Sequence, residues 1–464
     1  MSGVVIAGGG PAAHRLAARL LQHGYPGRVS VIGAEPRPAY HRALLASVLD
    51  GTLDAGRLAL PALPAAVRQL TGVTVRAVDR AARTLRTGDG RTLAYDVLVL
   101  ATGARTPLPP VAGLVSAPGH LADGVRTVRG AADCRPLPEG PVVVLGGGLR
   151  GVESALAVRR AGHEVTLVHP GGRLMGRHLD PVAAAMLAQW LTGQDITLQL
   201  GRRASEYTPG KVVLDDGQVL AAATVLLCTG TLPETGLARA SGLAVGAGVL
   251  VDDRLRTTDP HIHAIGDCAE HAGLPGATVL GAWEQAETLA RVLTGHDAAY
   301  TPGRRVLRPR TPGLDLVVVA PTGPPTGPGE ERRISLVDRA RGRYARLVLR
   351  GDTLHAATVM GSPAAVAAVS GLHLHETPLP ADLFALLGGG DGHYAGQQTL
   401  APEAVVCHCN NVTRTGVEDA WHAGARDLPA LARATRATTG CGGCAPLVRT
   451  LCTALAAGRN GETP

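Results

Sequence analysis

VVIAGGGPAAHRLAARLL, residues 4–21, runs from a short apolar stretch through a glycine-rich turn into a helix-like stretch. Gly8, Gly10 and Ala13 have the G-x-G-x-x-A spacing. The first glycine permits a tight turn, the second lets the backbone approach a pyrophosphate, and the small third residue lets the helix pack against the strand. The helix N-terminus would face the phosphates. A second strand-like run ends at Glu35, near the distance at which an acid meets a ribose hydroxyl. The stretch therefore predicts a dinucleotide-binding βαβ fold.

The same pattern returns in residues 140–175. Gly146, Gly148 and Gly151 have the G-x-G-x-x-G spacing between a strand-like and a helix-like run, and the next strand-like run ends at His169. Two phosphate-binding folds imply that the chain binds two dinucleotides.

The composition is that of a loop-rich globular protein, with 61 glycines and 33 prolines among 464 residues. This length predicts two to four domains. Aromatic residues make up only 2%, and the net charge of +7 comes from scattered arginines. These features argue against nucleic-acid binding. They leave open the alternative that a basic patch docks an acidic redox partner. Neither a signal peptide nor an apolar run of transmembrane length is found. We therefore expect a cytoplasmic protein that does not contact membranes.

Four of the eight cysteines lie in two short pieces near the C-terminus. Cys407 and Cys409 form C-x-C in CHCNN, and Cys441 and Cys444 form C-x-x-C in TTGCGGC. Because cytoplasmic thiols are usually reduced, such clusters indicate metal or redox chemistry before structural disulfides. Four thiolates at two chain reversals suit zinc, although structural zinc sites usually space both pairs as C-x-x-C or wider. The plant-type iron–sulfur spacing is absent, and free thiols are a further alternative.

Residues 1–300 resemble the flavoprotein reductases that bind two dinucleotides, a group that includes the glutathione, ferredoxin and rubredoxin reductases. LVLATGA at 98–104 and HIHAIGDCAE at 261–270 are further matching pieces. The resemblance implies FAD at the first glycine motif and NAD(P)H at the second. It also implies that Asp267 holds the flavin ribityl chain and that Glu153 lies near the nicotinamide.

One departure from this family concerns its thiol chemistry. The disulfide reductases of the group carry a C-x4-C pair in the first FAD helix, but this chain has no cysteine before Cys134. Cys134, Cys228, Cys268 and Cys452 are isolated and are interpreted as small buried hydrophobic residues. Electrons must therefore leave the flavin by another route.

Residues 404–456 resemble the bacterioferritin-associated ferredoxin module, a small helical [2Fe–2S] domain with similarly spaced C-x-C and C-x-x-C pairs. The resemblance favours an iron–sulfur cluster over zinc and implies that Cys407, Cys409, Cys441 and Cys444 are its ligands. A flavin accepts a hydride and can release electrons singly, whereas the cluster carries one electron. The implied path runs from NAD(P)H to FAD, then to the cluster and a one-electron acceptor. No general acid or base is nominated, because hydride transfer depends on alignment.

AEPRPAYHRALLASVL at 34–49 and GAWEQAETLA at 281–290 resemble the flavoprotein half of the large subunit of bacterial assimilatory nitrite reductase. This resemblance places Arg42 beside FAD, although a surface arginine after a turn would look the same. Those subunits continue into a sirohaem domain whose cysteines this chain lacks. We therefore expect an electron-transfer subunit whose partner is a separate catalytic nitrate or nitrite reductase chain. Oligomeric state is left open, a homodimer included.

Two alternatives stay open. One is a ferredoxin- or rubredoxin-type reductase with a fused ferredoxin, and the other is an iron-handling or redox-sensing [2Fe–2S] protein. Nucleotide choice follows no simple rule, since a carboxylate at the second strand end would favour NADH and an arginine NADPH. Here His169 ends the strand and Arg173 follows. We expect NADH to be preferred, with appreciable use of NADPH.

These arguments predict an α/β chain with two Rossmann-like domains, a small α+β domain and a small C-terminal helical [2Fe–2S] domain. The expected boundaries are 1–114 with 246–305 for FAD, 115–245 for NAD(P)H, 306–388 for the α+β domain, 389–403 for a glycine-rich linker and 404–458 for the cluster domain. The expected FAD contacts are Gly8, Gly10, Pro11, Ala12, Ala13, Glu35, Arg42, Thr102, Gly103, Gly266 and Asp267. The expected NAD(P)H contacts are Gly146, Gly148, Gly151, Glu153, His169, Arg173 and Gly230.

Overall fold

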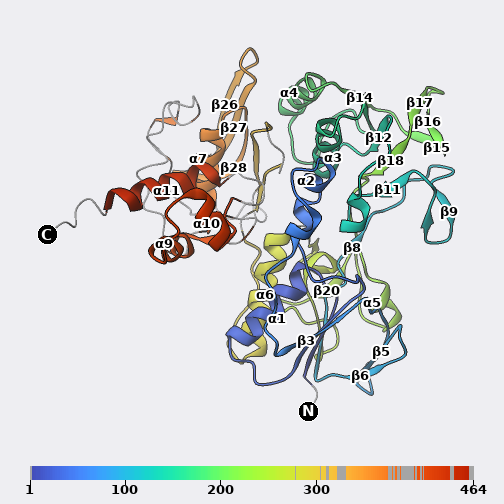
Figure 1. Ribbon diagram of the computed structural model, residues 1–464, viewed down its shortest axis with the longest axis vertical. Coiled ribbons are helices and arrows are strands. Elements are labelled where there is room, and N and C mark those ends of the chain that lie inside the picture. Colours follow the sequence, from blue (N-terminus) through green and yellow to red (C-terminus); the bar gives the residue numbers. More distant parts are fainter. Residues whose placement is uncertain are drawn as a thin grey trace.

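The computed structural model describes residues 3–276, 278–303, 305–309, 313–320, 331–374, 379, 382–383, 387, 402, 405–407, 410, 412–438 and 444–458. Figure 1 shows two α/β lobes, a separate antiparallel sheet and a small helical module at the C-terminal end. The glycine-rich linker expected at 389–403 lies outside these described residues except for Pro402.

The first lobe is a five-stranded parallel sheet in the order β21-β7-β1-β2-β3. Its strands are β1 Val4–Ala7, β2 Val29–Gly33, β3 Val67–Thr71, β7 Val97–Leu100 and β21 Ile262–Ala264. Strand β1 is buried along its whole length, as a central parallel strand requires. Helices α1 (Pro11–Gln22) and α6 (Val279–Leu293) pack against each other on this lobe. Because β21 pairs with β7, this sheet joins segments separated by the whole second lobe.

The second lobe repeats this architecture in the parallel order β11-β18-β12-β13-β14. Its elements are β11 Val125–Thr127, β12 Val142–Leu145, α3 Leu149–Arg160, β13 Val165–His169, α4 Pro181–Thr192, β14 Ile196–Leu200 and β18 Thr224–Leu227. All four residues of β12 are buried. The two glycine motifs therefore occupy equivalent positions, each between a buried strand and the helix that follows it.

The third sheet is antiparallel, in the order β24-β25-β28-β27-β26. Its strands are β24 Arg305–Leu307, β25 Leu316–Ala320, β26 Glu331–Asp338, β27 Arg343–Arg350 and β28 Thr353–Met360, and α7 (Pro363–Leu374) packs on it. A turn at residues 351–352 joins β27 to β28. The sheet and the helix agree with the small α+β domain expected from the sequence.

The C-terminal module consists of a short strand pair and helices. Strands β29 (Val405–Cys407) and β30 (Val412–Thr413) are antiparallel, and α9 (Arg414–His422), α10 (Leu428–Thr435) and α11 (Ala445–Gly458) follow. The three helices agree with the small helical domain that the resemblance implied, whereas the strand pair was not anticipated. Val417, Trp421, Leu431 and Val448 form the interior of the module.

Shorter elements complete the described chain. They are η1 Arg42–Leu44, α2 Ala46–Leu49, η2 Ala55–Leu58, β4 Val75–Asp79, β5 Thr84–Thr87, β6 Thr92–Ala94, β8 Ala104–Arg105, β9 Val115–Ala117, β10 His120–Leu121, η3 Ala131–Cys134, β15 Ala204–Thr208, β16 Gly210–Leu214, β17 Val219–Ala222, β19 Leu232–Pro233, α5 Gly236–Ala240, β20 Val249–Val251, η4 Gly266–Cys268, β22 Ala269–His271 and β23 Leu274–Pro275, where η marks a 3₁₀ turn. Within the described ranges, no helix has the length and apolarity needed to cross a membrane.

Candidate functional site

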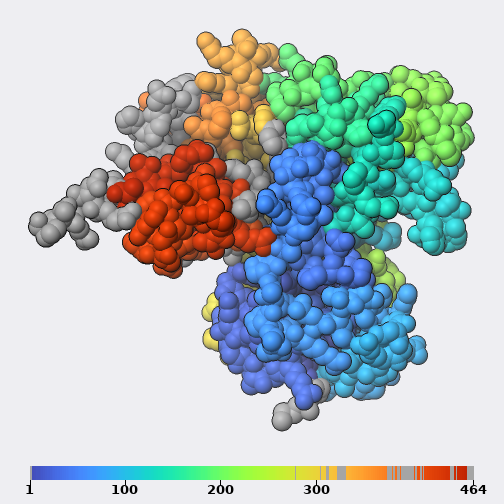
Figure 2. Space-filling view, in the orientation of Figure 1, coloured from blue at the N-terminus to red at the C-terminus, as the bar shows by residue number. Residues whose placement is uncertain are grey.

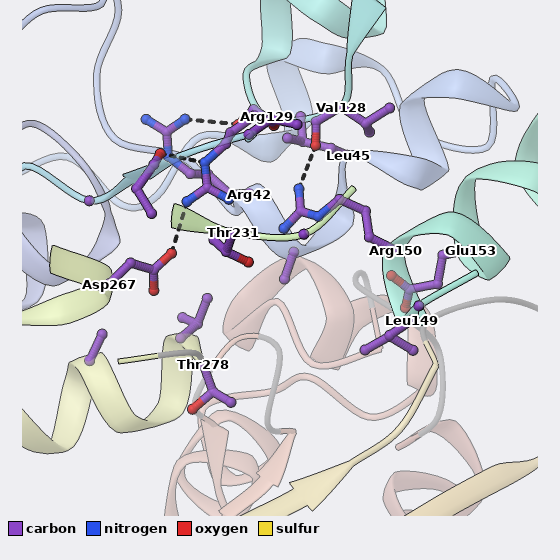
Figure 3. Close-up of a pocket in the computed structure, with 18 of the residues that line it drawn as sticks. Arg42, Leu45, Val128, Arg129, Leu149, Arg150, Glu153, Thr231, Asp267 and Thr278 are labelled. Carbon is purple, nitrogen blue, oxygen red and sulfur yellow. Dashed lines mark hydrogen bonds and ion pairs between the residues drawn. The ribbon is translucent and has the colours of Figure 1, made fainter. Parts of the chain in front are cut away.

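A large cavity, about 3060 Å³ in volume, lies between the two α/β lobes and reaches the C-terminal module. Small-molecule pockets are usually about 300–1,000 Å³, so this space exceeds what one small ligand needs. Residues of both glycine motifs line it, and so do Cys407 and Cys444. Figure 3 shows part of this cavity, with Arg42, Arg129 and Arg150 near one another.

The first glycine turn is shaped for an approaching phosphate. Gly8 has φ +136°, and a Cβ there would lie 2.0 Å from the carbonyl oxygen of Ala101. Gly10 precedes α1, which has no side-chain cap at its N-terminus. A Cβ at Gly10 would meet only Arg42 Nε, at 3.9 Å, so the space above this helix end is open. Uncapped amides facing open space form a ready anion site.

Glu35, Tyr40 and Arg42 form a network at one side of the cavity. The Tyr40 hydroxyl donates to Glu35 Oε2 at 2.7 Å, and Arg42 forms an ion pair with Glu35 Oε1. Arg42 also donates to the carbonyl oxygen of Arg129 at 3.0 Å. Burial raises the pKa of Tyr40 to about 12, so its hydroxyl remains a donor at neutral pH. Glu35 lies where the sequence placed it, but both of its oxygens already accept bonds from the chain.

Asp267 lies on η4 and pairs with Arg129 Nη2 at 3.0 Å (Figure 3). Burial lowers the pKa of Arg129, and the nearby Asp267 carboxylate partly offsets this shift by raising it. The Asp133 carboxylate holds this loop by accepting the backbone N–H of Arg129 at 2.9 Å and of Gly130 at 2.8 Å. Sequence reasoning missed Arg129, because it belongs to neither glycine motif. Arg129 lines the cavity between Arg42 and Asp267, two of the expected FAD contacts.

The second glycine turn repeats the geometry of the first. Gly146 has φ +122°, and a Cβ there would lie 2.3 Å from the carbonyl oxygen of Cys228. A Cβ at Gly151 would lie 1.7 Å from the carbonyl oxygen of Gly146, which explains why helix and strand can pack so closely. Around Gly148, before the uncapped N-terminus of α3, no atom lies within 4 Å of such a Cβ. This opening suits a second pyrophosphate.

Two further side chains of α3 line the cavity near this turn. Arg150 donates to the carbonyl oxygen of Val128, which joins the helix to the loop that carries Arg129. Glu153 is only 8% exposed and lies beside Leu149 in Figure 3. Glu153 was expected from the sequence, whereas Arg150 was not.

The end of β13 carries positive rather than negative groups. Burial lowers the pKa of His169, so this imidazole is mainly neutral at pH 7. Arg177, Arg202 and Arg203 also line the cavity, and the Arg202 amide donates to the His169 carbonyl oxygen at 3.2 Å. Arg173, in contrast, is exposed and does not line the cavity. Three arginines that the sequence did not single out therefore line the cavity, whereas Arg173, which the sequence did single out, does not.

The isolated cysteines lack the features of a redox relay. Cys134, Cys228 and Cys268 are buried. Burial raises the pKa of the Cys134 thiol to about 12 and also raises the pKa values of Cys228 and Cys268. Since the thiolate is the reactive form, these thiols are inert at neutral pH. Cys452 is partly exposed, so the expectation that it is buried was wrong.

Two of the four expected cluster ligands can be placed. Cys407 is 1% exposed at the end of β29, and Cys444 precedes α11. Asn410 Nδ2 lies 3.8 Å from Cys407 Sγ, and the Thr438 amide donates to Cys444 Sγ at 3.3 Å. N–H groups directed at cysteine sulfurs are a feature of iron–sulfur sites, where they tune the potential. Cys409 and Cys441 lie outside the described residues.

The predicted contacts converge on one cavity. Of the expected FAD contacts, all except Ala13 line it, and of the expected NAD(P)H contacts, all except Gly151 and Arg173 do. Ala13 is fully buried and, like Gly151, permits close packing of helix and strand. The binding roles themselves stay predictions.

Comparison with known families matches both parts of the chain. Residues 2–290 match the family described as pyridine nucleotide-disulphide oxidoreductase. Residues 405–453 match the BFD-like [2Fe-2S] binding domain. The first family implies FAD and NAD(P)H, and the second implies a [2Fe–2S] cluster, in agreement with the cofactors expected from the sequence.

Among curated proteins, the assimilatory nitrate reductase electron transfer subunit of Bacillus subtilis (strain 168) is 28% identical over 97% of this chain. The nitrite reductase [NAD(P)H] of the same organism is 29% identical over 91% of it. This chain spans only 59% and 53% of the lengths of these relatives. A solved structure of putidaredoxin reductase in a covalent complex with putidaredoxin has a TM-score of 0.72 and 26% identity, and the match covers 83% of this chain and 95% of that one.

Proposed function

Because the chain belongs to the pyridine nucleotide-disulphide oxidoreductase family, we propose that it oxidises NAD(P)H and passes the electrons through FAD and a [2Fe–2S] cluster to a partner protein. The observation that carries this proposal is the shared cavity: both glycine turns, Cys407 and Cys444 line it. A continuous space between these three groups suits electron transfer within one chain.

The residues around the cavity have separate parts in this proposal. The two uncapped helix ends bind the pyrophosphates, and the open space at Gly10 and Gly148 lets the backbone approach them. Asp267 and Arg129 orient the flavin side chain, and Glu153 lies at the nicotinamide side of the cavity. Bound FAD would supply hydride acceptance and one-electron release, and a bound cluster would supply one-electron transfer. The protein contributes alignment, so no acid or base is assigned.

The cluster is proposed to be held by Cys407, Cys409, Cys441 and Cys444. The N–H groups of Asn410 and Thr438 directed at two of these sulfurs support thiolate ligands, because thiolate charge is stabilised by such donors. The match of residues 405–453 to a [2Fe-2S] binding domain supports iron over zinc.

The partner is proposed to be a separate chain that reduces nitrate or nitrite. The names of the two Bacillus subtilis relatives support this choice. A cytoplasmic location belongs to the same proposal. An alternative partner, a ferredoxin-type acceptor of another enzyme, is supported by the likeness to putidaredoxin reductase.

The deciding experiment follows electrons in the purified protein without oxygen. Addition of NADH or NADPH should bleach the flavin absorbance first and then produce the paramagnetic resonance signal of a reduced [2Fe–2S] cluster. Addition of a purified nitrate or nitrite reductase with its substrate should reoxidise both. Stoichiometric zinc without iron, or a cluster that NAD(P)H never reduces, would exclude this function. Reoxidation by a ferredoxin alone would favour the alternative partner.

A further inference from the structure

The C-terminal module is joined to the FAD lobe by an arginine at the end of α10. We propose that Arg436 docks this module onto the segment Ala55–Leu60 and positions Cys407 for electron transfer from the flavin site. This proposal rests on the proposed function and adds to it the residue that brings the two redox sites together.

The docking contact uses both ends of the guanidinium. Arg436 Nη1 donates to the carbonyl oxygen of Ala59 at 2.6 Å, and Nη2 donates to that of Arg57 at 3.0 Å. The planar fork of arginine matches two acceptors held at fixed positions, which a lysine could not reproduce. Figure 2 shows the module, in red, beside the blue N-terminal segment of the chain.

The segment that receives Arg436 is bonded to the wall of the flavin site. The His41 amide donates to the Leu58 carbonyl oxygen, and the Leu60 amide donates to that of Ala39, both at 2.9 Å. Between these two bonds lies Tyr40, whose hydroxyl binds Glu35. Arg436 therefore contacts the segment that forms an isolated antiparallel bridge with Tyr40, two residues before Arg42. Docking at this place sets the module at a fixed position relative to the cavity.

The backbone of Arg436 reaches the cluster side of the module. Its carbonyl oxygen accepts a hydrogen bond from Asn410 Nδ2, the same atom that lies 3.8 Å from Cys407 Sγ. Arg436 has φ +64°, a left-handed conformation that is unfavourable for residues other than glycine. This conformation directs the carbonyl toward Asn410 while the side chain extends to the FAD lobe. One residue thus connects the docking contact with a cluster ligand.

Loss of the docking contact should slow electron transfer without changing either redox site. Electron transfer rates fall steeply with distance, and undocking would let the module move away from the flavin. Hydride transfer from NAD(P)H to FAD should not change, because the NAD(P)H site is formed by the other lobe. Arg436 is therefore proposed as a positioning residue.

The test compares Arg436→Asn with Arg433→Gln in the FAD- and cluster-loaded protein. Asparagine tolerates the left-handed conformation, so the end of α10 should be kept while the fork is removed. Arg433 lies in the last turn of the same helix, is exposed, and loses the same charge. In anaerobic stopped-flow measurements, Arg436→Asn should leave flavin reduction unchanged and slow cluster reduction at least tenfold. Arg433→Gln should behave as the wild type, and Arg436→Lys should be intermediate.

A second readout does not depend on turnover. Hydrogen exchange of the amides in residues 57–60 should accelerate in Arg436→Asn and not in Arg433→Gln, while iron content and the resonance signal of the chemically reduced cluster stay unchanged. Wild-type cluster reduction and wild-type exchange in Arg436→Asn would overturn the proposal, as would equal slowing in Arg433→Gln. A wild-type protein whose cluster NAD(P)H does not reduce would refute the proposed function instead, and the exchange measurement would still decide the docking contact.

Discussion

At the scale of single residues, the arginines that line the cavity together with His169 lead to a prediction about nucleotide choice. Arg203 is exposed and lines the cavity, whereas Arg202 is paired with Asp216 at 3.2 Å. A 2′-phosphate near the end of β13 would gain a charge-assisted hydrogen bond from Arg203, worth about 1.5–3 kcal/mol. We therefore expect Arg203→Gln to weaken binding of 2′,5′-ADP about tenfold or more, with little effect on ADP-ribose. Titration calorimetry of the purified protein measures both.

Arg173→Gln is the control for this prediction, because Arg173 is exposed near the same strand end but does not line the cavity. An equal loss in both variants would mean that general charge, and not Arg203, attracts the phosphate. The preference for NADH expected from the sequence stays a prediction. It would be wrong if kcat/KM for NADPH exceeded that for NADH by more than about tenfold, or about 1.4 kcal/mol.

A second residue-scale prediction concerns His263 in β21, which is 3% exposed. Burial lowers the pKa of its imidazole to about 4, from an ordinary value of 6.5. Below pH 6.5 the unfolded chain binds a proton that the folded chain refuses, so stability falls as the pH drops from about 6.5 toward 4. Between pH 7 and pH 5 this histidine should cost about 2 kcal/mol of unfolding free energy.

Urea unfolding at the two pH values tests this expectation. His263→Leu should show a loss between pH 7 and pH 5 that is smaller than the wild-type loss by about that amount. The comparison cancels the contributions of other histidines. If the variant and the wild type lost the same free energy, the buried imidazole would not be the source of the pH dependence.

At the scale of elements, α3 carries two neighbouring ion pairs with different surroundings. Arg160 donates to Asp50 Oδ2 from Nε at 3.0 Å and from Nη2 at 2.5 Å, and the Asp50 side chain is 1% exposed. Arg159 pairs with Asp195 at 2.9 Å, but the Asp195 side chain is 79% exposed. Because Asp50 follows α2, the first pair joins the two α/β lobes, whereas the second lies within one lobe.

These surroundings predict different costs for the same substitution. Arg160→Ala leaves a buried carboxylate without this partner and should lower the unfolding free energy by about 2–4 kcal/mol. Arg159→Ala removes a solvent-screened pair and should cost about 0–1 kcal/mol. Denaturant unfolding at neutral pH measures both variants. Similar losses would show that Asp50 is better solvated than its burial indicates.

At the scale of the whole molecule, the proposed division of labour predicts which activities survive loss of the cluster. Cys407→Ser should remove or disrupt the cluster, because a buried thiolate ligand is lost. Reduction of a dye that takes electrons from the flavin should continue at nearly the wild-type rate, since both glycine turns are intact. Reduction of nitrate or nitrite through the partner enzyme should fall to background.

Cys452→Ser is the matched control, since Cys452 lies in the same module but is not an expected ligand. It should retain iron and partner-coupled activity. If Cys407→Ser kept partner-coupled activity, the cluster would lie off the electron path, and the assignment of the four cysteines would have to be abandoned. The intact chain by itself should reduce neither ion.

The sequence by itself determined the two nucleotide folds and the cluster module, because their signals are local. The glycine spacing within one turn determines where the backbone can approach a phosphate. Two cysteine pairs with short spacing indicate a metal or redox site. The paired folds and the helical C-terminal module were predicted for this reason. Gly8, Gly10, Gly146 and Gly148 all line the cavity, and their contacts with dinucleotides stay predictions.

Only the tertiary structure decided which distant groups meet. Arg129 reaches Asp267, Arg203 lines the same cavity as His169, and Arg436 contacts Ala59, although no motif joins these residues in the chain. The physical reason is that these contacts come from the packing of lobes and modules, and an arginine in a loop has the same local sequence signal whether it faces solvent or a distant carbonyl. The same reason explains why the sequence favoured Arg173, which lies near His169 in the chain but outside the cavity.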